Sequence, residues 1–142
     1  MSDTDAPVSQ MLAAYKAAVH AKDVDAYCAL FADDLHAFDM WGRWSHEGLP
    51  AWRATASDWF GSLGEDRVAV DFDEVHASTS GDMASAHAYV KFSAVSPAGA
   101  TLRSMDNRLT WVLRRRDGAW KVVHQHTSAP LANANAQPMF QR

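Results

Sequence analysis

The sequence predicts an α+β fold, in which a curved antiparallel sheet forms a cone around three N-terminal helices and leaves an open-ended cavity. Two observations predict it. Apolar residues recur at helical spacing as far as Leu63 and at strand spacing in four later segments. The 142 residues also include six tryptophans, and long strands accompanied by few helices must curl to bury such large rings.

Three helices are predicted from apolar residues spaced three or four positions apart. The first covers residues 8–19. The second follows Asp23, whose carboxylate suits an N-cap, and its apolar stripe runs on to Phe31. The third begins near Pro50, because proline is favoured in the first turn of a helix, and it ends near Leu63.

Strands are predicted before the third helix and after it. A short strand is expected at residues 35–41, and longer strands at 68–79, 83–95, 101–116 and 120–128. The later strands are separated by turn signals such as Asp117-Gly118. One domain is expected at residues 7–130, followed by an irregular tail at 131–142.

Composition excludes several classes of protein. The net charge of −4 disfavours a protein that binds nucleic acid through its phosphates. The single cysteine, Cys28, rules out a disulfide within the chain, and no apolar run reaches the length that spans a membrane. The first ten residues are polar and acidic, unlike a secretory signal, so we expect a cytoplasmic protein.

Asp39 is the first candidate for a functional residue. In a strand it shares a face with Leu35, Ala37 and Trp41, which are otherwise apolar. A carboxylate held in an apolar pocket becomes useful for moving protons. The alternative is a carboxylate that is hydrated, or that only holds a neighbouring group in place.

The segments AKDVDAYCALFADDLHAFDMWG and RRRDGAWKVVHQHTSAP resemble the nuclear transport factor 2-like superfamily, and most of all its SnoaL-like and ketosteroid-isomerase-like branch. The second segment is also similar to the association domain of calcium/calmodulin-dependent protein kinase. The resemblance covers about Pro7 to Pro130 and implies the cone-shaped fold. Because enzymes, binding proteins and oligomerisation modules share this fold, it implies no single function.

The isomerase resemblance puts a general-base aspartate at Asp39 and a helix-one tyrosine at Tyr15, which would stabilise an enolate. It implies no cofactor. The isomerase's second acid falls on Trp111 or Val112, so one oxyanion donor is missing, a loss that typically costs ~3 kcal/mol of transition-state stabilisation. For Tyr15 the simpler interpretation is a core residue of an amphipathic helix.

The kinase association domain resemblance puts Lys91 where those domains carry a pocket arginine. Periodicity alone predicts that Lys91 faces water and that the alanine-rich opposite face of its strand faces the core. The resemblance implies instead that the face with Lys91 lines the cavity and that the alanine-rich face packs on a second subunit. Following the resemblance, the expected ligand-binding residues are Trp41, Tyr89, Lys91, Asn107, Trp111 and Gln125.

His124 and His126 are two residues apart on a strand, but no third ligand is evident, so no metal site is predicted. The resemblance puts this pair on the convex face.

Taken together, these features lead us to expect a cytoplasmic homodimer with a small-molecule ligand in its cavity. Three functions remain open: an isomerase- or cyclase-type enzyme using Asp39, a binder of a small apolar or carboxylate ligand, and an oligomerisation module.

Overall fold

The computed structural model describes residues 6–142 of the chain, so the first half of the polar N-terminal segment lies outside the described residues. The helices are α1 (Ala6–Ala21), α2 (Val24–Cys28) and α3 (Leu49–Ser62). The strands are β1 (Phe31–Phe38), β2 (His46–Glu47), β3 (Arg67–Ser80), β4 (Met83–Val95), β5 (Thr101–Arg116) and β6 (Ala119–Ser128). The α+β prediction is confirmed.

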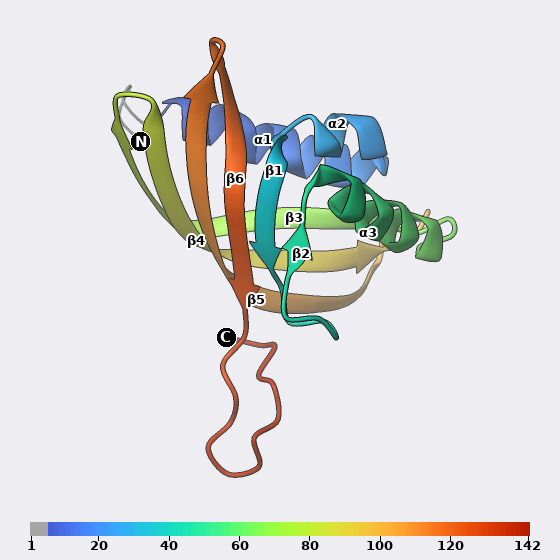
Figure 1. Ribbon diagram of the computed structural model, residues 1–142. Helices are drawn as coiled ribbons and strands as arrows, with labels where there is room; N and C mark the ends of the chain where they lie inside the picture. The colour runs from blue at the N-terminus through green and yellow to red at the C-terminus, as the bar shows by residue number, and fades with distance from the viewer. Residues whose placement is uncertain (1–5) are drawn as a thin grey trace.

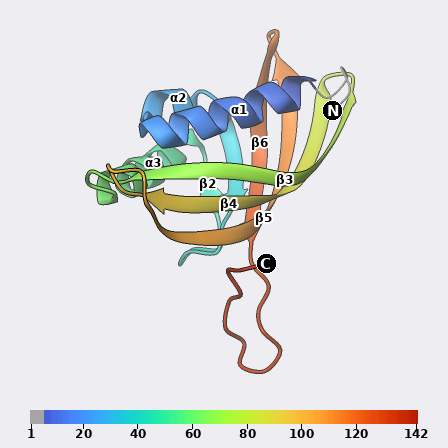
Figure 2. The same ribbon diagram turned by 180° about the vertical axis from the view of Figure 1, so that it is seen from behind.

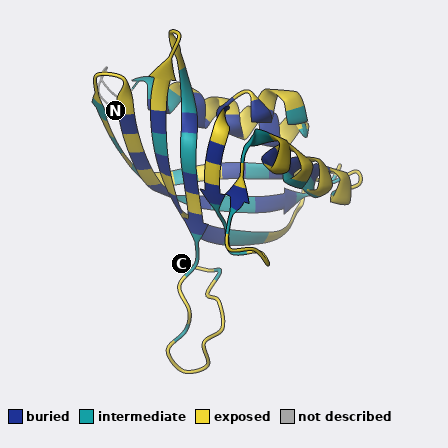
Figure 3. Ribbon diagram, in the orientation of Figure 1, coloured by how far each residue is buried: buried dark blue, intermediate teal, exposed yellow. Residues whose placement is uncertain are grey.

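The six strands form one curved sheet in the order β2-β1-β6-β5-β4-β3, and the three helices lie against its concave side (Figures 1 and 2). All neighbouring strands are antiparallel except β1 and β6, which are parallel. Buried and exposed residues alternate along much of the long strands (Figure 3), as expected for a sheet with one face against the core.

The helices begin where the sequence indicates. Asp23 accepts a hydrogen bond from the Ala26 backbone N–H at 3.0 Å and caps α2. Pro50 lies in the first turn of α3. The predicted stripe of α1 is buried, from Val8 to Val19, and packs against β3.

Three local predictions were wrong. α2 ends at Cys28 rather than continuing to Phe31, and the first strand runs from Phe31 to Phe38. That strand ends because the Asp39 carboxylate accepts the Trp41 backbone N–H at 3.0 Å, which turns the chain out of the sheet. The short strand β2, paired with β1, was not predicted.

The tail is less irregular than predicted. Leu131 and Pro138 form an isolated antiparallel bridge, so the chain leaves β6, makes a loop and returns to the base of the sheet (Figure 1). There the Asp106 backbone N–H of β5 donates to the Phe140 carbonyl oxygen at 2.7 Å.

Candidate functional site

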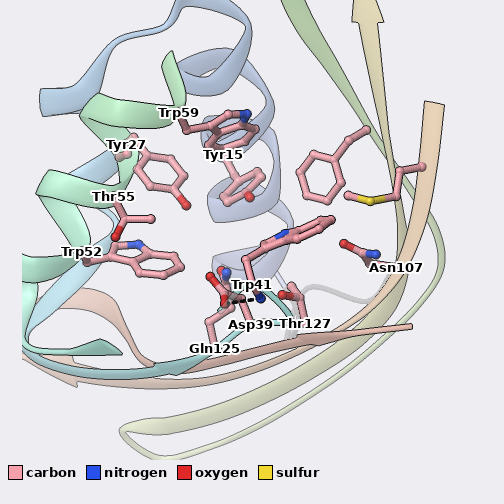
Figure 4. A pocket seen from close by; sticks show the side chains of 13 residues that line it. Tyr15, Tyr27, Asp39, Trp41, Trp52, Thr55, Trp59, Asn107, Gln125 and Thr127 are labelled. Carbon is pink, nitrogen blue, oxygen red and sulfur yellow. Dashed lines mark hydrogen bonds between the residues drawn. The ribbon is translucent and has the colours of Figure 1, made fainter. Parts of the chain in front are cut away.

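The concave side of the sheet and the helices enclose a cavity of about 360 Å³. Its wall is mainly aromatic, and the rings come from all three helices, from the loop after β1 and from β4 (Figure 4). These rings belong to Tyr15, Tyr27, Trp41, Trp52, Trp59 and Phe92. Such a cavity has the size and character of a small-molecule site.

Asp39 lines this cavity, as predicted, but it does not stand alone. Its Oδ2 lies 3.0 Å from His46 Nε2, and the two side chains are only 12% and 6% exposed. In this contact the imidazole Nε2–H is the donor to the carboxylate oxygen. With Oδ1 held by the Trp41 backbone N–H, the carboxylate has a fixed orientation at the cavity wall.

Tyr15 and Tyr27 bring two phenolic groups to the helix side of the cavity (Figure 4). Burial raises the pKa of Tyr15 to about 12, a rise that a hydrogen bond with Tyr27 partly offsets. Burial, with the neighbouring Tyr15, raises the pKa of Tyr27 well above its usual value. Both hydroxyls are therefore protonated at neutral pH, and because they share a hydrogen bond, one of the two O–H groups is left to donate to another acceptor.

Trp52 adds a third donor next to these tyrosines. Its indole Nε1 is buried and makes no hydrogen bond of ordinary geometry, although it lies near enough to Tyr27 to lower the pKa of that hydroxyl slightly. A buried N–H without an acceptor is unfavourable, so a ligand acceptor that reached this nitrogen, after the side chains that cover it had moved aside, would satisfy it.

Two predicted lining residues, Asn107 and Gln125, do face the cavity. The Gln125 Oε1 accepts a hydrogen bond from Trp111 Nε1 at 2.9 Å, and Trp111 is completely buried behind it. Trp111 therefore holds a lining residue in place rather than lining the cavity itself. The Asn107 side-chain amide donates to the Asp106 carbonyl oxygen at 2.9 Å.

Tyr89 and Lys91 are not in the cavity, and the expectation that placed them there was wrong. The alanine-rich face of β4 is buried against the core, and Phe92 on that face lines the cavity. Strand alternation therefore puts Tyr89 and Lys91 on the outer face, where Lys91 Nζ lies 3.3 Å from Asp106 Oδ1. None of the lining residues in the described part of the chain is positively charged.

His124 and His126 lie on the outer face of β6 as well. A register shift opposite Val112 and Leu113 inserts one residue, so Val122 and Gln125 face inward while both histidines do not. His124 Nδ1 donates to the His36 carbonyl oxygen at 2.7 Å. Across residues 6–142 no three His, Cys, Asp or Glu side chains are grouped closely enough to hold a metal ion.

Several residues of the site were missed in the sequence. The sequence did not single out Tyr27, Trp52 and Trp59 as lining residues, because residues that line a cavity and residues that fill a core have the same helical spacing. His46 gave no signal, since it meets Asp39 through the turn between β1 and β2. No helix within residues 6–142 is long and apolar enough to cross a membrane.

Comparisons with known proteins agree with this architecture. A family model described as a SnoaL-like domain matches residues 8–132. An NTF2-like protein of unknown function from Pseudomonas putida KT2440 is 24% identical, with a TM-score of 0.85 over 97% of this chain and 94% of its own. No curated protein matches.

Two further solved structures share the fold. An NTF2-like protein with a cystatin-like fold from Novosphingobium aromaticivorans is 18% identical, with a TM-score of 0.78 over 94% of this chain and 86% of its own. A protein from Xanthomonas campestris, named for the calcium/calmodulin dependent protein kinase II association domain, is 16% identical, with a TM-score of 0.73 over 87% of this chain and 85% of its own. At these identities the likeness shows the fold alone.

Proposed function

Because this chain belongs to the SnoaL-like domain family, we propose that it binds a small, neutral, largely apolar carbonyl compound, and that Asp39 removes a proton from the carbon next to the carbonyl. One observation carries the proposal: a fixed carboxylate and a group of hydrogen-bond donors line the same aromatic cavity. The donors are the one O–H group that the Tyr15–Tyr27 pair leaves free and the Trp52 indole N–H.

The charge of the cavity favours a neutral ligand. Asp39 is the only ionisable carboxylate among the described lining residues, and no lysine, arginine or histidine accompanies it there. A ligand carboxylate would be repelled by Asp39 and would leave water without a cationic partner. With Lys91 on the outer face, the carboxylate ligand considered from sequence loses its support.

In the proposed reaction, an Asp39 oxygen accepts the proton while the electron pair of the broken C–H bond moves into the enolate and onto its oxygen. The Tyr15 hydroxyl, with Tyr27 and Trp52 beside it, would hydrogen bond to that oxygen as its charge grows. In a pair of hydroxyls that share one hydrogen bond, one O–H stays free to donate. In ketosteroid isomerases a second acid donates to the oxyanion, and its position here is occupied by Trp111 or Val112. The Trp52 N–H would supply the missing donor in its place.

A non-catalytic binding protein is the second candidate. It is favoured by the two hydrogen bonds that Asp39 already makes, to His46 Nε2 and to the Trp41 backbone N–H. A carboxylate held in this way can serve to fix the loop that carries Trp41, in which case the cavity binds its ligand without reacting with it.

Deuterium exchange separates the two candidates without knowledge of the natural ligand. β-Acetylnaphthalene, an aromatic methyl ketone, is incubated with the protein in D2O, and loss of its methyl proton signal is followed by NMR. General-base catalysis typically contributes on the order of 100-fold or more, so Asp39→Asn should lower the protein-dependent exchange rate by about that factor. Binding of the ketone, measured by calorimetry, should change less than about twofold, because asparagine has nearly the same shape and no charge partner in the ketone is lost.

Asp33→Asn is the matched control, since Asp33 is an exposed carboxylate on β1. It should leave exchange and binding as in the wild type. If the ketone binds but shows no protein-dependent exchange, the role of Asp39 as a general base is rejected and the non-catalytic binding function is retained. Failure of the ketone to bind would reject both.

A further inference from the structure

Trp41 lies at the boundary between the cavity and solvent. Its side chain lines the cavity, yet the residue is 57% exposed. It belongs to the loop after β1, and among the described residues its one ring contact is with Phe140, at a centroid distance of 6.0 Å and an interplanar angle of 26°. Figure 4 shows the indole reaching in among the lining side chains. The position of this ring therefore depends on the tail.

The tail in turn is held by a free edge of the sheet. β6 pairs with β5 only from Arg108 onward, so residues 101–107 of β5 have no strand on that side. Residues 139–142, here called the C-terminal latch, occupy this edge. Asp106 N–H donates to the Phe140 carbonyl oxygen at 2.7 Å, and Gln141 Nε2 donates to the Ser104 carbonyl oxygen at 2.7 Å. Free strand edges readily accept such additions.

Arg142 fastens the latch on the outer face. Its backbone N–H donates to Asp106 Oδ2 at 3.0 Å, and its guanidinium lies 3.3 Å from Asp73 and 3.1 Å from Glu74. The same guanidinium lies 3.6 Å from the centroid of the Tyr89 ring. The bulge in β3 between Asp73 and His76 falls at these carboxylates.

These contacts are suited to reversible attachment. Both carboxylates that meet the guanidinium are well exposed, and exposed ion pairs are individually weak and screened by salt. The guanidinium contacts are therefore the ones that break most readily, whereas the hydrogen bonds to Phe140 and to the Arg142 N–H are made by the buried Asp106.

We propose that the C-terminal latch holds the Trp41 ring across the mouth of the cavity, and that its release lets the ligand enter and leave. Phe140 positions Trp41, and Arg142 sets how often the latch opens. A gate that opens irrespective of the ligand scales the association and dissociation rate constants by the same factor and leaves the dissociation constant unchanged.

The test is the binding kinetics of β-acetylnaphthalene, followed by quenching of tryptophan fluorescence in a stopped-flow instrument. In Arg142→Met, loss of two exposed ion pairs and a cation–π contact should accelerate both rate constants on the order of tenfold, with the dissociation constant within about twofold of wild type. Added salt should accelerate the wild type and not this variant. Phe140→Ala should accelerate both rates, and Arg103→Met, which replaces an exposed arginine on β5 outside the latch, should not.

Hydrogen exchange of the Asp106 amide gives a readout that needs no ligand. Release of the latch frees this N–H, so Arg142→Met should raise its exchange rate on the order of tenfold, by the same opening equilibrium. Unchanged rate constants in both latch variants would overturn the proposal. A faster dissociation rate with an unchanged association rate would also overturn it, because the latch would then stabilise the bound ligand without controlling its entry. If the ketone fails to bind, the proposed function fails, whereas unchanged Asp106 exchange still overturns the latch.

Discussion

Replacing Trp52 by phenylalanine tests whether its buried indole N–H serves the ligand. In the free protein two effects oppose each other. Removing an unpaired buried donor is worth roughly 1–3 kcal/mol, while the smaller ring loses about 1–2 kcal/mol of apolar burial. We therefore expect the free energy of unfolding to change by no more than about 1 kcal/mol, measured by urea denaturation.

Ligand affinity, unlike the free energy of unfolding, should change clearly in this variant. A neutral hydrogen bond contributes about 1 kcal/mol, so Trp52→Phe should weaken β-acetylnaphthalene roughly fivefold. β-Isopropylnaphthalene has a similar shape and no carbonyl, and its affinity should change far less. Calorimetric titration of both compounds gives the difference directly.

Trp59→Phe provides the matched control, since Trp59 is a half-buried tryptophan that lines the same cavity from the same helix. It should weaken both compounds by similar factors, because only ring surface is lost. If Trp52→Phe also weakens both equally, the indole is only part of the wall, and the reasoning from its unpaired N–H is refuted.

Three other predictions concern the protein without ligand. The Tyr15 pKa is about 12 in the folded protein and near 10 in the unfolded chain. Above pH 10 the unfolded chain therefore loses the Tyr15 proton first, and the free energy of unfolding falls as the pH rises towards 12. Tyr15→Phe should remove up to about 3 kcal/mol of that fall, measured by urea denaturation at alkaline pH. Gln125→Leu leaves the buried Trp111 N–H unpaired and should cost about 1–3 kcal/mol by thermal unfolding, whereas the same change at exposed Gln137 should cost almost nothing. The predicted homodimer should appear as a particle of two chains in light scattering, and a monomer at every concentration would reject it.

The order of helices and strands could be predicted because each buries one face, and burial leaves a periodic trace in the sequence. α1, α3 and the four long strands were predicted to within a few residues of their observed bounds. β2 left no such trace, because two residues are too few to show a period. Its partner strand ended earlier than expected, through a side-chain hydrogen bond of Asp39 that composition does not reveal.

Side-chain orientation was predictable only where strands are regular. For β4, simple alternation gave the correct face, and the family resemblance gave the wrong one for Tyr89 and Lys91. For β6, alternation failed, because the register shift beside Val122 reverses the faces and puts His124 outside. The Asp39–His46 contact depends on how the loop folds back, which no spacing in the sequence specifies.

The parallel pairing of β1 with β6 has a consequence for biosynthesis. β1 finds its parallel neighbour only when β6 has left the ribosome, so one edge of β1 stays unpaired after α1 is already able to pack against β3. The hydrogen-bonding groups on that edge stay open to contacts with other chains until β6 pairs with them, and this last pairing joins β1 and β2 to the rest of the sheet.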